Sequence, residues 1–248
     1  MTKVIIVSDI HGNLEAFNAV LNDCRNYDEF LFLGDAVDYG PNPAEVIDLL
    51  KSLGARSVMG NHDKAVAYKV DCRCSEELHD LSVYTRENIS NKLLTKSDLS
   101  FLRKMRVKSS FYIDNLKVYM VHASPKNPLY GYIWPWLDDE KIEEKMKETT
   151  VYGSKSIDAD MILLGHTHYQ FKKELPKMKN LLVNPGSVGQ PRDGDRRAGY
   201  AILIPDEARV IFRRVKYNVE NVLKEYKRLD LERKYLERLR SILLNGKI

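Results

Sequence analysis

Five short polar segments hold most of the residues in this sequence that could perform chemistry. They cover residues 9–11, 34–38, 60–63, 121–124 and 165–168, and each follows a short apolar run typical of a buried strand. Aspartate and histidine side chains together suit zinc, manganese, iron or nickel, and a carboxylate can bridge two ions. The residue types therefore indicate a site for divalent transition-metal ions.

The spacing within two of these segments supports one common site. Alternate residues of an extended segment face the same way, so Asp9 and His11 can reach one pocket, as can His166 and His168. A single motif of this kind more often belongs to a turn or to the ordinary surface. Five such segments, each placed after a predicted strand, favour the shared metal site over that interpretation.

The elements that must position these residues begin with a β-α-β-α-β pattern. Apolar runs at 4–7, 30–33 and 56–59 predict strands, and the apolar spacing within 14–21 and 46–50 predicts helices between them. Such a pattern indicates a sheet covered on both faces, which binds its ligands at the carboxyl ends of the strands. The polar segments lie at these ends.

The remaining chain predicts a helical insertion, a second set of strands and a closing helix. Helical spacing fills 64–105, and strands are expected at 111–113, 118–121, 161–164, 180–184, 200–204 and 209–215. The closing helix is expected over 218–244. Since no repeat or flexible linker interrupts the sequence, we predict a single domain over residues 1–248.

The composition is that of an ordinary globular protein. The chain has 248 residues, of which 44% are hydrophobic and 30% charged, and this balance excludes disordered and collagen-like classes. No apolar run approaches the roughly 20 residues that cross a bilayer, so no membrane partner is expected. A net charge of +4 is too small to indicate nucleic-acid binding. Three cysteines and the lack of a visible leader favour the cytoplasm.

Taken together, the five segments resemble the calcineurin-like metallophosphoesterase superfamily. Its pattern is D-x-H, G-D-x-x-D, G-N-H-D/E, a lone histidine after a strand, and G-H-x-H, and this sequence matches every part. Segments 39–46, 84–88 and 184–192 further resemble a bacterial and archaeal phosphodiesterase branch. The resemblance implies an α/β fold, namely a four-layer αββα sandwich of two mixed β-sheets flanked by helices.

The resemblance also implies roles for single residues. It assigns one divalent ion to Asp9, His11, Asp35 and His168, and a second to Asp35, Asn61, His122 and His166. Asp35 would bridge the two ions, which could be Mn, Ni, Fe or Zn. His62 would protonate the leaving oxygen or stabilise the charge on it, with Asp38 fixing its tautomer. Asp63 is expected to cap the helix that follows it.

The activity that these assignments imply is hydrolysis of a phosphodiester or nucleotide phosphoanhydride bond by a hydroxide that bridges the two ions. The expected substrate is a small phosphate ester or a nucleotide. Two alternatives stay open, a phosphomonoesterase (including a protein phosphatase) and a catalytically idle binding scaffold. The sequence also leaves open whether the chain forms a homo-oligomer.

One position departs from the pattern of the superfamily's protein phosphatases. They carry a phosphate-binding arginine in G-D-x-V-D-R-G, where this sequence has Tyr39. Loss of that bidentate contact favours diesters, which carry one negative charge, over monoester dianions. Arg192 could replace the arginine as a substrate contact, or it could be a solvated surface residue.

Two further groups of residues leave their role open. Cys72 and Cys74, with His79 nearby, could be metal ligands, but one intervening residue is too few for the usual zinc knuckle. The aromatic residues Tyr130, Tyr132, Trp134 and Trp136 could form a stacking platform for a base beside the metals. A hydrophobic contact or an oligomer interface is the commoner role of such a cluster.

Overall fold

A computed structural model of the chain describes residues 1–151, 153–175 and 178–248, and two five-stranded sheets form its centre. The first sheet contains, in order, β12 (Arg209–Val215), β11 (Ala198–Ile204), β1 (Val4–Val7), β2 (Glu29–Phe32) and β3 (Arg56–Ser57). The second contains β4 (Lys108–Ile113), β5 (Leu116–Val121), β8 (Met161–Leu163), β10 (Asn180–Pro185) and β9 (Gln170–Leu175). Both sheets are mixed, since each combines parallel and antiparallel pairs.

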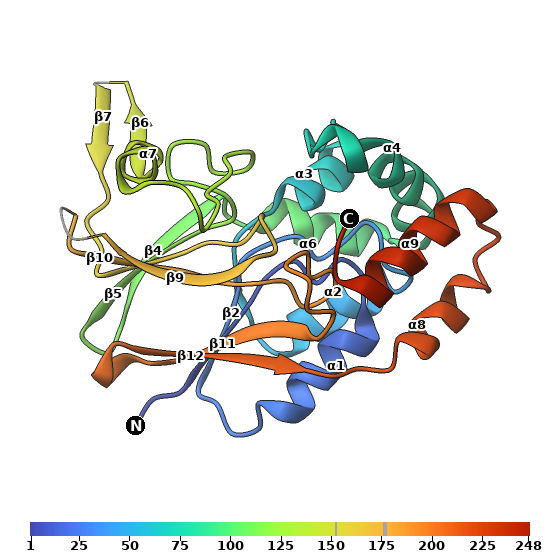
Figure 1. Ribbon diagram of the computed structural model, residues 1–248, viewed down its shortest axis with the longest axis horizontal. Coiled ribbons are helices and arrows are strands. Elements are labelled where there is room, and N and C mark those ends of the chain that lie inside the picture. Colours follow the sequence, from blue (N-terminus) through green and yellow to red (C-terminus); the bar gives the residue numbers. More distant parts are fainter. Residues whose placement is uncertain (152, 176–177) are drawn as a thin grey trace.

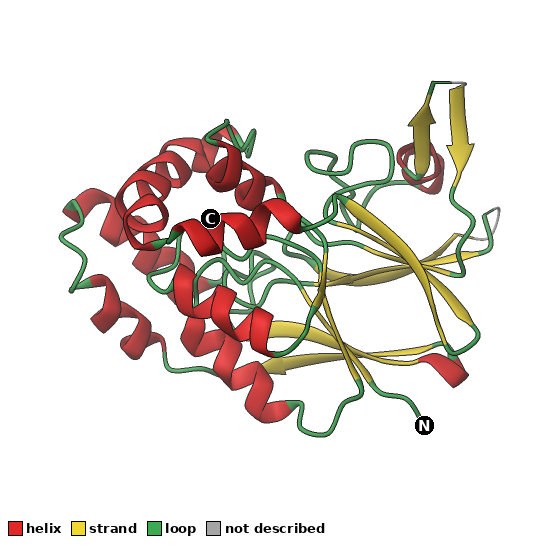
Figure 2. Cartoon of the chain, turned by 180° about the vertical axis from the view of Figure 1, so that it is seen from behind, coloured by secondary structure: helices red, strands yellow, loops and turns green. Residues whose placement is uncertain are grey.

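Helices and a small hairpin surround these sheets (Figure 1). The helices are α1 (Leu14–Asp23), α2 (Pro43–Ser52), α3 (Asn61–Tyr68), α4 (Glu76–Thr85), the π-helical η1 (Arg86–Ser90), α5 (Asn91–Leu93), α6 (Lys96–Lys104), α7 (Asp139–Lys145), the 3-10 helix η2 (Pro205–Glu207), α8 (Val219–Tyr226) and α9 (Arg233–Asn245). The hairpin pairs β6 (Lys147–Thr150) with β7 (Gly153–Ser156). Figure 2 shows most helices on one side of the molecule and most strands on the other. In the described part of the chain, no helix is both long and apolar enough to span a membrane.

Alternate strand residues pack into different cores, which gives the fold its layers. Val4 and Ile6 of β1 pack between the two sheets with residues of β5, β8 and β10. Ile5 and Val7 face the opposite way and pack with apolar residues of α1 and α2. In β8, Ile162 packs against α7 on the outer face of the second sheet. This two-sided burial confirms the predicted four-layer α/β sandwich.

The helical stretch predicted at 64–105 is present, and it begins earlier and consists of several helices. It extends from α3, which starts at Asn61, to α6, and α6 packs through Leu102 on the core beneath the first sheet. Thr95 accepts a hydrogen bond from the backbone N–H of Asp98, whose carboxylate accepts one from the N–H of Thr95. This reciprocal pair caps α6 at its predicted start.

The single closing helix predicted over 218–244 is wrong, because the chain forms two helices there. A continuous helix would place Ile242 about 24 Å from Tyr226, at 1.5 Å per residue. The chain instead ends α8 at Tyr226 and starts α9 at Arg233. Both helices can then pack on one cluster, which contains Tyr226, Ile242 and Tyr39. The prediction of a single domain over 1–248 stays a prediction, as does the cytoplasmic location.

The sequence patterns gave no indication of α7, the β6–β7 hairpin or β9. The hairpin strands are mostly exposed and lack an apolar alternation. Strand β9 lies at the edge of its sheet and carries Lys172 and Lys173, a feature that protects edge strands from pairing with other chains. Polar edge strands carry too little hydrophobic periodicity to be recognised from one sequence.

The core between the sheets provides a test of the fold. Leu163→Ala removes a fully buried side chain from this core and should lower the free energy of unfolding by about 2–5 kcal/mol. The matched control, Leu93→Ala on exposed α5, should change it by less than about 0.5 kcal/mol. Urea unfolding measures both values, and equal losses for the two variants would contradict the assigned core.

Candidate metal centre

The candidate ligands come from the ends of strands in both sheets. Asp9 and His11 follow β1 of the first sheet, whereas His122 follows β5 and His166 and His168 follow β8 of the second. The two sheets lie face to face, so these strand ends deliver their side chains to one place. All of these side chains are buried, as are those of Asp35 and Asn61.

Left-handed backbone conformations turn several ligands inward. The φ angle is 52° at Asp9, 47° at His11, 63° at Asp35, 66° at His166 and 62° at His168. Each such conformation costs a non-glycine residue about 1–3 kcal/mol and tends to persist at functional sites. Hydrogen bonds between neighbouring loops fix them, since the N–H of Asp9 donates to Gly34 and that of His11 donates to Asp35.

A first group of ligand atoms consists of Asp9, His11 and His168. The Nε2 atom of His168 lies 3.2 Å from Asp9 Oδ1 and 3.4 Å from His11 Nε2. The other oxygen of Asp9 accepts a hydrogen bond from the backbone N–H of His166. Oδ1 therefore faces the two imidazoles and has no hydrogen-bond partner in the described structure.

A second group consists of Asp35, His122 and His166, with Asn61 beside them. His122 Nε2 lies 3.1 Å from Asp35 Oδ2 and 3.1 Å from Asn61 Oδ1. Asp35 Oδ1 accepts from the backbone N–H of His62, which leaves Oδ2 directed into the centre. Because the same Oδ2 lies 3.9 Å from His11 Nε2, Asp35 is positioned between the two groups.

Outward hydrogen bonds direct the Nε2 atoms of three imidazoles inward. The Nδ1 atoms of His11, His122 and His168 lie 2.9, 2.7 and 2.6 Å from backbone carbonyl oxygens. A carbonyl can only accept, so each Nδ1–H donates, and in the neutral ring each Nε2 presents a lone pair inward. Nε2 of His166 is also buried without a partner among the described residues. This convergence of imidazole nitrogens and carboxylate oxygens fits bound cations.

Burial and charge set the protonation of these imidazoles. Burial lowers the pKa of His11, His166 and His168 below the ordinary value, and the charge of Arg192 adds to the effect at His168. Burial acts in the same direction on His122, but the adjacent Asp35 carboxylate outweighs it and raises the pKa to about 9. His122 is therefore the one of these four ligands that binds a proton at neutral pH when metal is absent.

His62 and Asp38 form a hydrogen-bonded pair at the edge of this centre. Nδ1 of His62 lies 2.9 Å from Asp38 Oδ2, and the His62 ring lies 5.1 Å from that of His11. Burial lowers the pKa of His62, but Asp35 and Asp38 outweigh it and the net shift is upward. An imidazole held in this way keeps a proton near neutral pH and can donate it from Nε2.

Three residues outside the predicted set hold the site in place. Arg86 donates to Asp38 Oδ2 from Nε at 3.1 Å and from Nη2 at 2.8 Å, and Ser90 donates to the other oxygen at 3.0 Å. The backbone carbonyl of Cys72 accepts from Asn61 Nδ2, which turns the amide oxygen of Asn61 inward. Arg86 lies in the segment 84–88 that carried the family resemblance, but no sequence signal paired it with Asp38.

Asp63 caps its helix as predicted, and it also holds the loop of Asp35. Its carboxylate accepts from the N–H of Gly60 at the start of α3, and from the N–H groups of Asp35 and Ala36 at 2.8 Å. Gly60 is required at this contact, since a Cβ there would lie 2.0 Å from Asp35 Oδ1. The second role of Asp63 could not be seen in the sequence because its partners are 27 and 28 residues away.

Tyr39 and Arg192 lie beside the centre in different ways. Tyr39 is 2% exposed and places its ring edge-on to that of His11 at 5.0 Å. Arg192 is half-buried and donates from Nη2 to the side-chain oxygen of Gln190. The backbone carbonyl of Gln190 accepts from His168 Nδ1, so Arg192 is bonded to a residue that contacts the first group of ligands.

The cysteine pair lies near His62 rather than in a separate metal site with His79. Within the described residues, Cys72 belongs to one cluster with His62 and Cys74, and to another with Asp71 and His79. Nε2 of His79 lies 3.0 Å from Asp71 Oδ2, in an exposed contact. The predicted set of Cys72, Cys74 and His79 is thus divided between two clusters.

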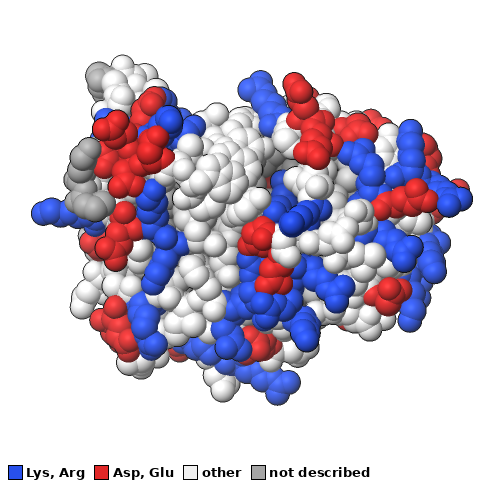
Figure 3. Space-filling view, in the orientation of Figure 1, with Lys and Arg blue, Asp and Glu red and all other residues white. Residues whose placement is uncertain are grey.

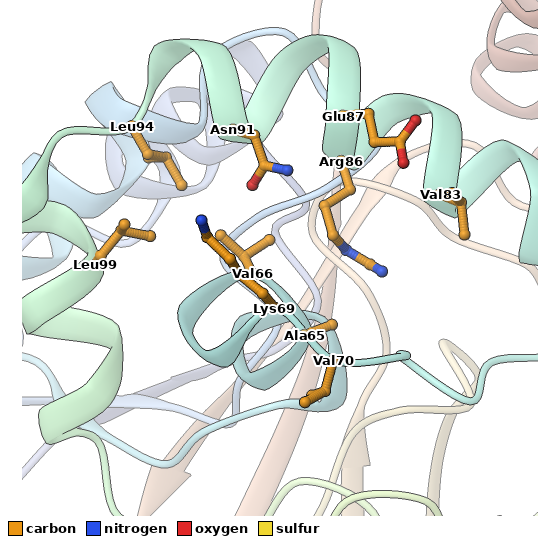
Figure 4. A pocket seen from close by; sticks show the side chains of 10 residues that line it. All are labelled: Ala65, Val66, Lys69, Val70, Val83, Arg86, Glu87, Asn91, Leu94 and Leu99. Atoms are coloured by element: carbon orange, nitrogen blue, oxygen red, sulfur yellow. The ribbon is translucent and has the colours of Figure 1, made fainter.

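A cavity of about 420 Å³ lies behind the His62–Asp38 pair, between α3 and η1 (Figure 4). In the close-up, Arg86 extends from η1 toward α3, and Lys69 extends from α3 toward Asn91. None of the candidate metal ligands is among the residues that line this cavity. It is therefore separate from the centre, and Arg86, which lines it, also donates to Asp38.

Comparisons with known proteins agree with this geometry. Residues 2–207 match the sequence model of the calcineurin-like phosphoesterase superfamily domain. The chain is 35% identical over 236 residues to an uncharacterized protein of Methanocaldococcus jannaschii, which covers 88% of this chain and 89% of that protein. It superposes on the crystal structure of a metallophosphoesterase from Sphaerobacter thermophilus with a TM-score of 0.79 at 28% identity, covering 99% of both chains.

A shorter match links the chain to a named enzyme. It is 31% identical over 134 residues to the symmetrical bis(5′-nucleosyl)-tetraphosphatase of Pectobacterium carotovorum. That match covers 48% of this chain and 42% of the enzyme, so the chain matches less than half of the enzyme's length.

The protonation of His122 gives a test of the centre. In metal-free protein at pH 7, His122 should be a cation, whereas His11, His166 and His168 should be neutral. A bound metal must displace the His122 proton, so metal affinity should rise with pH and level off above about 9. Nitrogen-15 NMR of labelled histidines resolves the protonation states, and a neutral His122 at pH 7 would contradict the assigned contact with Asp35.

Proposed function

Because the chain belongs to the calcineurin-like phosphoesterase superfamily, we propose that it is a phosphoesterase dependent on two divalent transition-metal ions. It would hydrolyse phosphodiester or nucleotide phosphoanhydride bonds. The observation that carries this proposal is the convergence of buried lone pairs around Asp35 Oδ2, which lies within 3.1 Å of His122 Nε2 and 3.9 Å of His11 Nε2. Neutral imidazole and carboxylate ligands suit manganese, nickel, iron or zinc.

The chain offers a ligand set to each ion. One ion would be held by Asp9, His11, Asp35 and His168, the other by Asp35, Asn61, His122 and His166. Two such ions supply positive charge to a bound phosphate and lower the pKa of a water molecule. The protein orients these ligands by hydrogen bonds. Backbone N–H groups donate to the carboxylates of Asp9 and Asp35, and backbone carbonyl oxygens accept from Nδ1 of three of the histidines.

His62 would supply the proton that the leaving oxygen needs. Asp38 accepts from its Nδ1, so the proton to be donated is held on Nε2. Arg86 donates from Nε and Nη2 to Asp38 Oδ2 and offsets the charge of this carboxylate. A general acid at this place is useful to an enzyme and unnecessary for an idle scaffold, so the arrangement supports catalysis.

The position of Tyr39 supports diesters or anhydrides over monoesters as substrates. Its buried side chain carries no charge and cannot replace the phosphate-binding arginine of protein phosphatases. The relative named as a symmetrical bis(5′-nucleosyl)-tetraphosphatase supports the nucleotide anhydride. Arg192, near His168, is the remaining candidate for a contact to the substrate phosphate.

Replacing His62 separates chemistry from metal binding. His62→Gln should leave the metal content unchanged and lower kcat about 100-fold or more, the range of general-acid catalysis. The loss should be smaller for a nitrophenyl leaving group, which needs no proton, than for a nucleoside. His79→Gln, which changes a histidine paired with exposed Asp71, is the matched control and should keep full activity. Unchanged turnover of the nucleoside ester by His62→Gln would remove His62 from the mechanism.

The choice between diester and monoester tests the substrate class. With Tyr39 in place of an arginine, kcat/KM should be higher for bis-p-nitrophenyl phosphate than for p-nitrophenyl phosphate. Initial rates with manganese, nickel, iron and zinc in turn measure the ratio. A preference for the monoester would favour a phosphomonoesterase, and no turnover of either ester with any metal would favour an idle scaffold.

A further inference from the structure

A stack of aromatic rings leads from the candidate metal centre to the surface. The centre of the Tyr132 ring lies 4.2 Å from that of His166. On its other side, the Trp134 ring lies 5.2 Å from Tyr132 at an interplanar angle of 10°. Trp136 follows at 5.2 Å and 9°. We call Tyr132, Trp134 and Trp136 the aromatic ladder. It begins at a candidate metal ligand and ends at Trp136, which is 65% exposed.

Neighbouring residues fix the ladder in place. Its rings alternate along an extended segment, and Ile133, which lies between two of them, is fully buried in the core with residues of α7. Tyr169 packs edge-on against Trp134 at 5.7 Å and against Trp136 at 5.2 Å. Lys173 holds the end of the segment through a bond to the carbonyl of Leu137. The exposed indole is thus presented in a fixed orientation.

The ladder forms one wall of an open cleft. The cleft has a volume of about 610 Å³ and is also lined by Arg192, Lys247, Glu77 and Asp193. Asp193 is paired with Arg214, which offsets its charge, while Arg192 lies near the metal centre. Figure 3 shows an area without charged side chains between the β6–β7 hairpin and the helices. The cleft therefore combines flat apolar rings with two cationic side chains, Arg192 and Lys247, and the carboxylate of Glu77.

We propose that this cleft binds the nucleobase of a nucleotide whose phosphate chain extends to the metal centre. The ring-to-ring steps of 4.2, 5.2 and 5.2 Å put Trp136 beyond the reach of a single phosphate group, so a polyphosphate must bridge the two places. Bases stack on exposed aromatic rings, and the cations favour an anionic ligand over a neutral aromatic one. The 5.2 Å spacing is too small to admit a third ring between the two indoles, so the base stacks on the open face of Trp136. The location of the phosphate rests on the proposed function, whereas stacking of the base does not.

Intrinsic fluorescence can test this directly, because the chain has two tryptophans and both belong to the ladder. Adenosine 5′-monophosphate should quench the emission with saturation, and ribose 5-phosphate, which lacks the base, should not. Trp136→Ala should weaken adenosine monophosphate binding about tenfold or more, with Trp134 as the remaining reporter. Tyr112→Ala, which removes an exposed ring from β4, is the matched control and should bind normally.

A kinetic comparison links the cleft to catalysis. The γ-(p-nitrophenyl) ester of adenosine 5′-triphosphate and methyl p-nitrophenyl phosphate share a leaving group, and only the first carries a nucleoside, at the end of a phosphate chain. Trp136→Ala should raise KM about tenfold for the nucleotide ester and leave that of the methyl ester within about twofold. Quenching by the nucleotide without hydrolysis of either ester would retain the base site and reject the proposed function.

Other results would overturn the base site. Equal binding of adenosine monophosphate and ribose 5-phosphate would show that only phosphate is recognised. Hydrolysis of both esters with no effect of Trp136→Ala would reject the base site and retain the proposed function. Dissociation of an oligomer by Trp136→Ala, without any nucleotide quenching, would show that the ladder is an interface between copies of the chain.

Discussion

Buried carboxylate oxygens and imidazole nitrogens that face one another are the constraint on which the rest of this structure depends. Asp9 Oδ1, Asp35 Oδ2 and the Nε2 atoms of the histidines would repel one another unless cations or protons lay among them. The protein holds them together through left-handed backbone conformations and bonds between loops. It also needs Gly60, since a side chain there would collide with Asp35. These features lower the stability of a metal-free chain, and bound ions would restore it.

The two-sheet architecture provides the rigidity that such a site requires. Strands β1 and β2 of the first sheet and β5 and β8 of the second deliver ligands to a common edge, and the core between the sheets fixes their relative position. Helices then supply residues that hold the side chains of the site in position. The carboxylate of Asp63 at the start of α3 holds the Asp35 loop, and Arg86 of η1 holds Asp38. A small movement of α3 would displace the ligands Asn61 and Asp35, and a small movement of η1 would displace Asp38.

Prediction from the sequence was most successful where a motif of aspartate and histidine residues directly follows an apolar run. The apolar run from Val4 to Val7 predicted a strand of a sheet covered on both faces, and the motifs after each strand predicted residues that now lie together. The four-layer sandwich was implied by the family resemblance. Prediction failed where function depends on partners far apart in the chain. The bond between Arg86 and Asp38 joins residues 48 positions apart, and the break between α8 and α9 follows from packing on Tyr39. Edge strand β9 and the exposed β6–β7 hairpin were missed because polar strands carry no hydrophobic signal.

The central claim is that two cations share Asp35, and anomalous diffraction from crystals grown with Mn²⁺ tests it most directly. The account predicts two manganese peaks in each molecule, one in contact with Asp9, His11 and His168 and the other with Asn61, His122 and His166. Both peaks should contact the carboxylate of Asp35. A single peak, or two peaks of which only one touches Asp35, would contradict it.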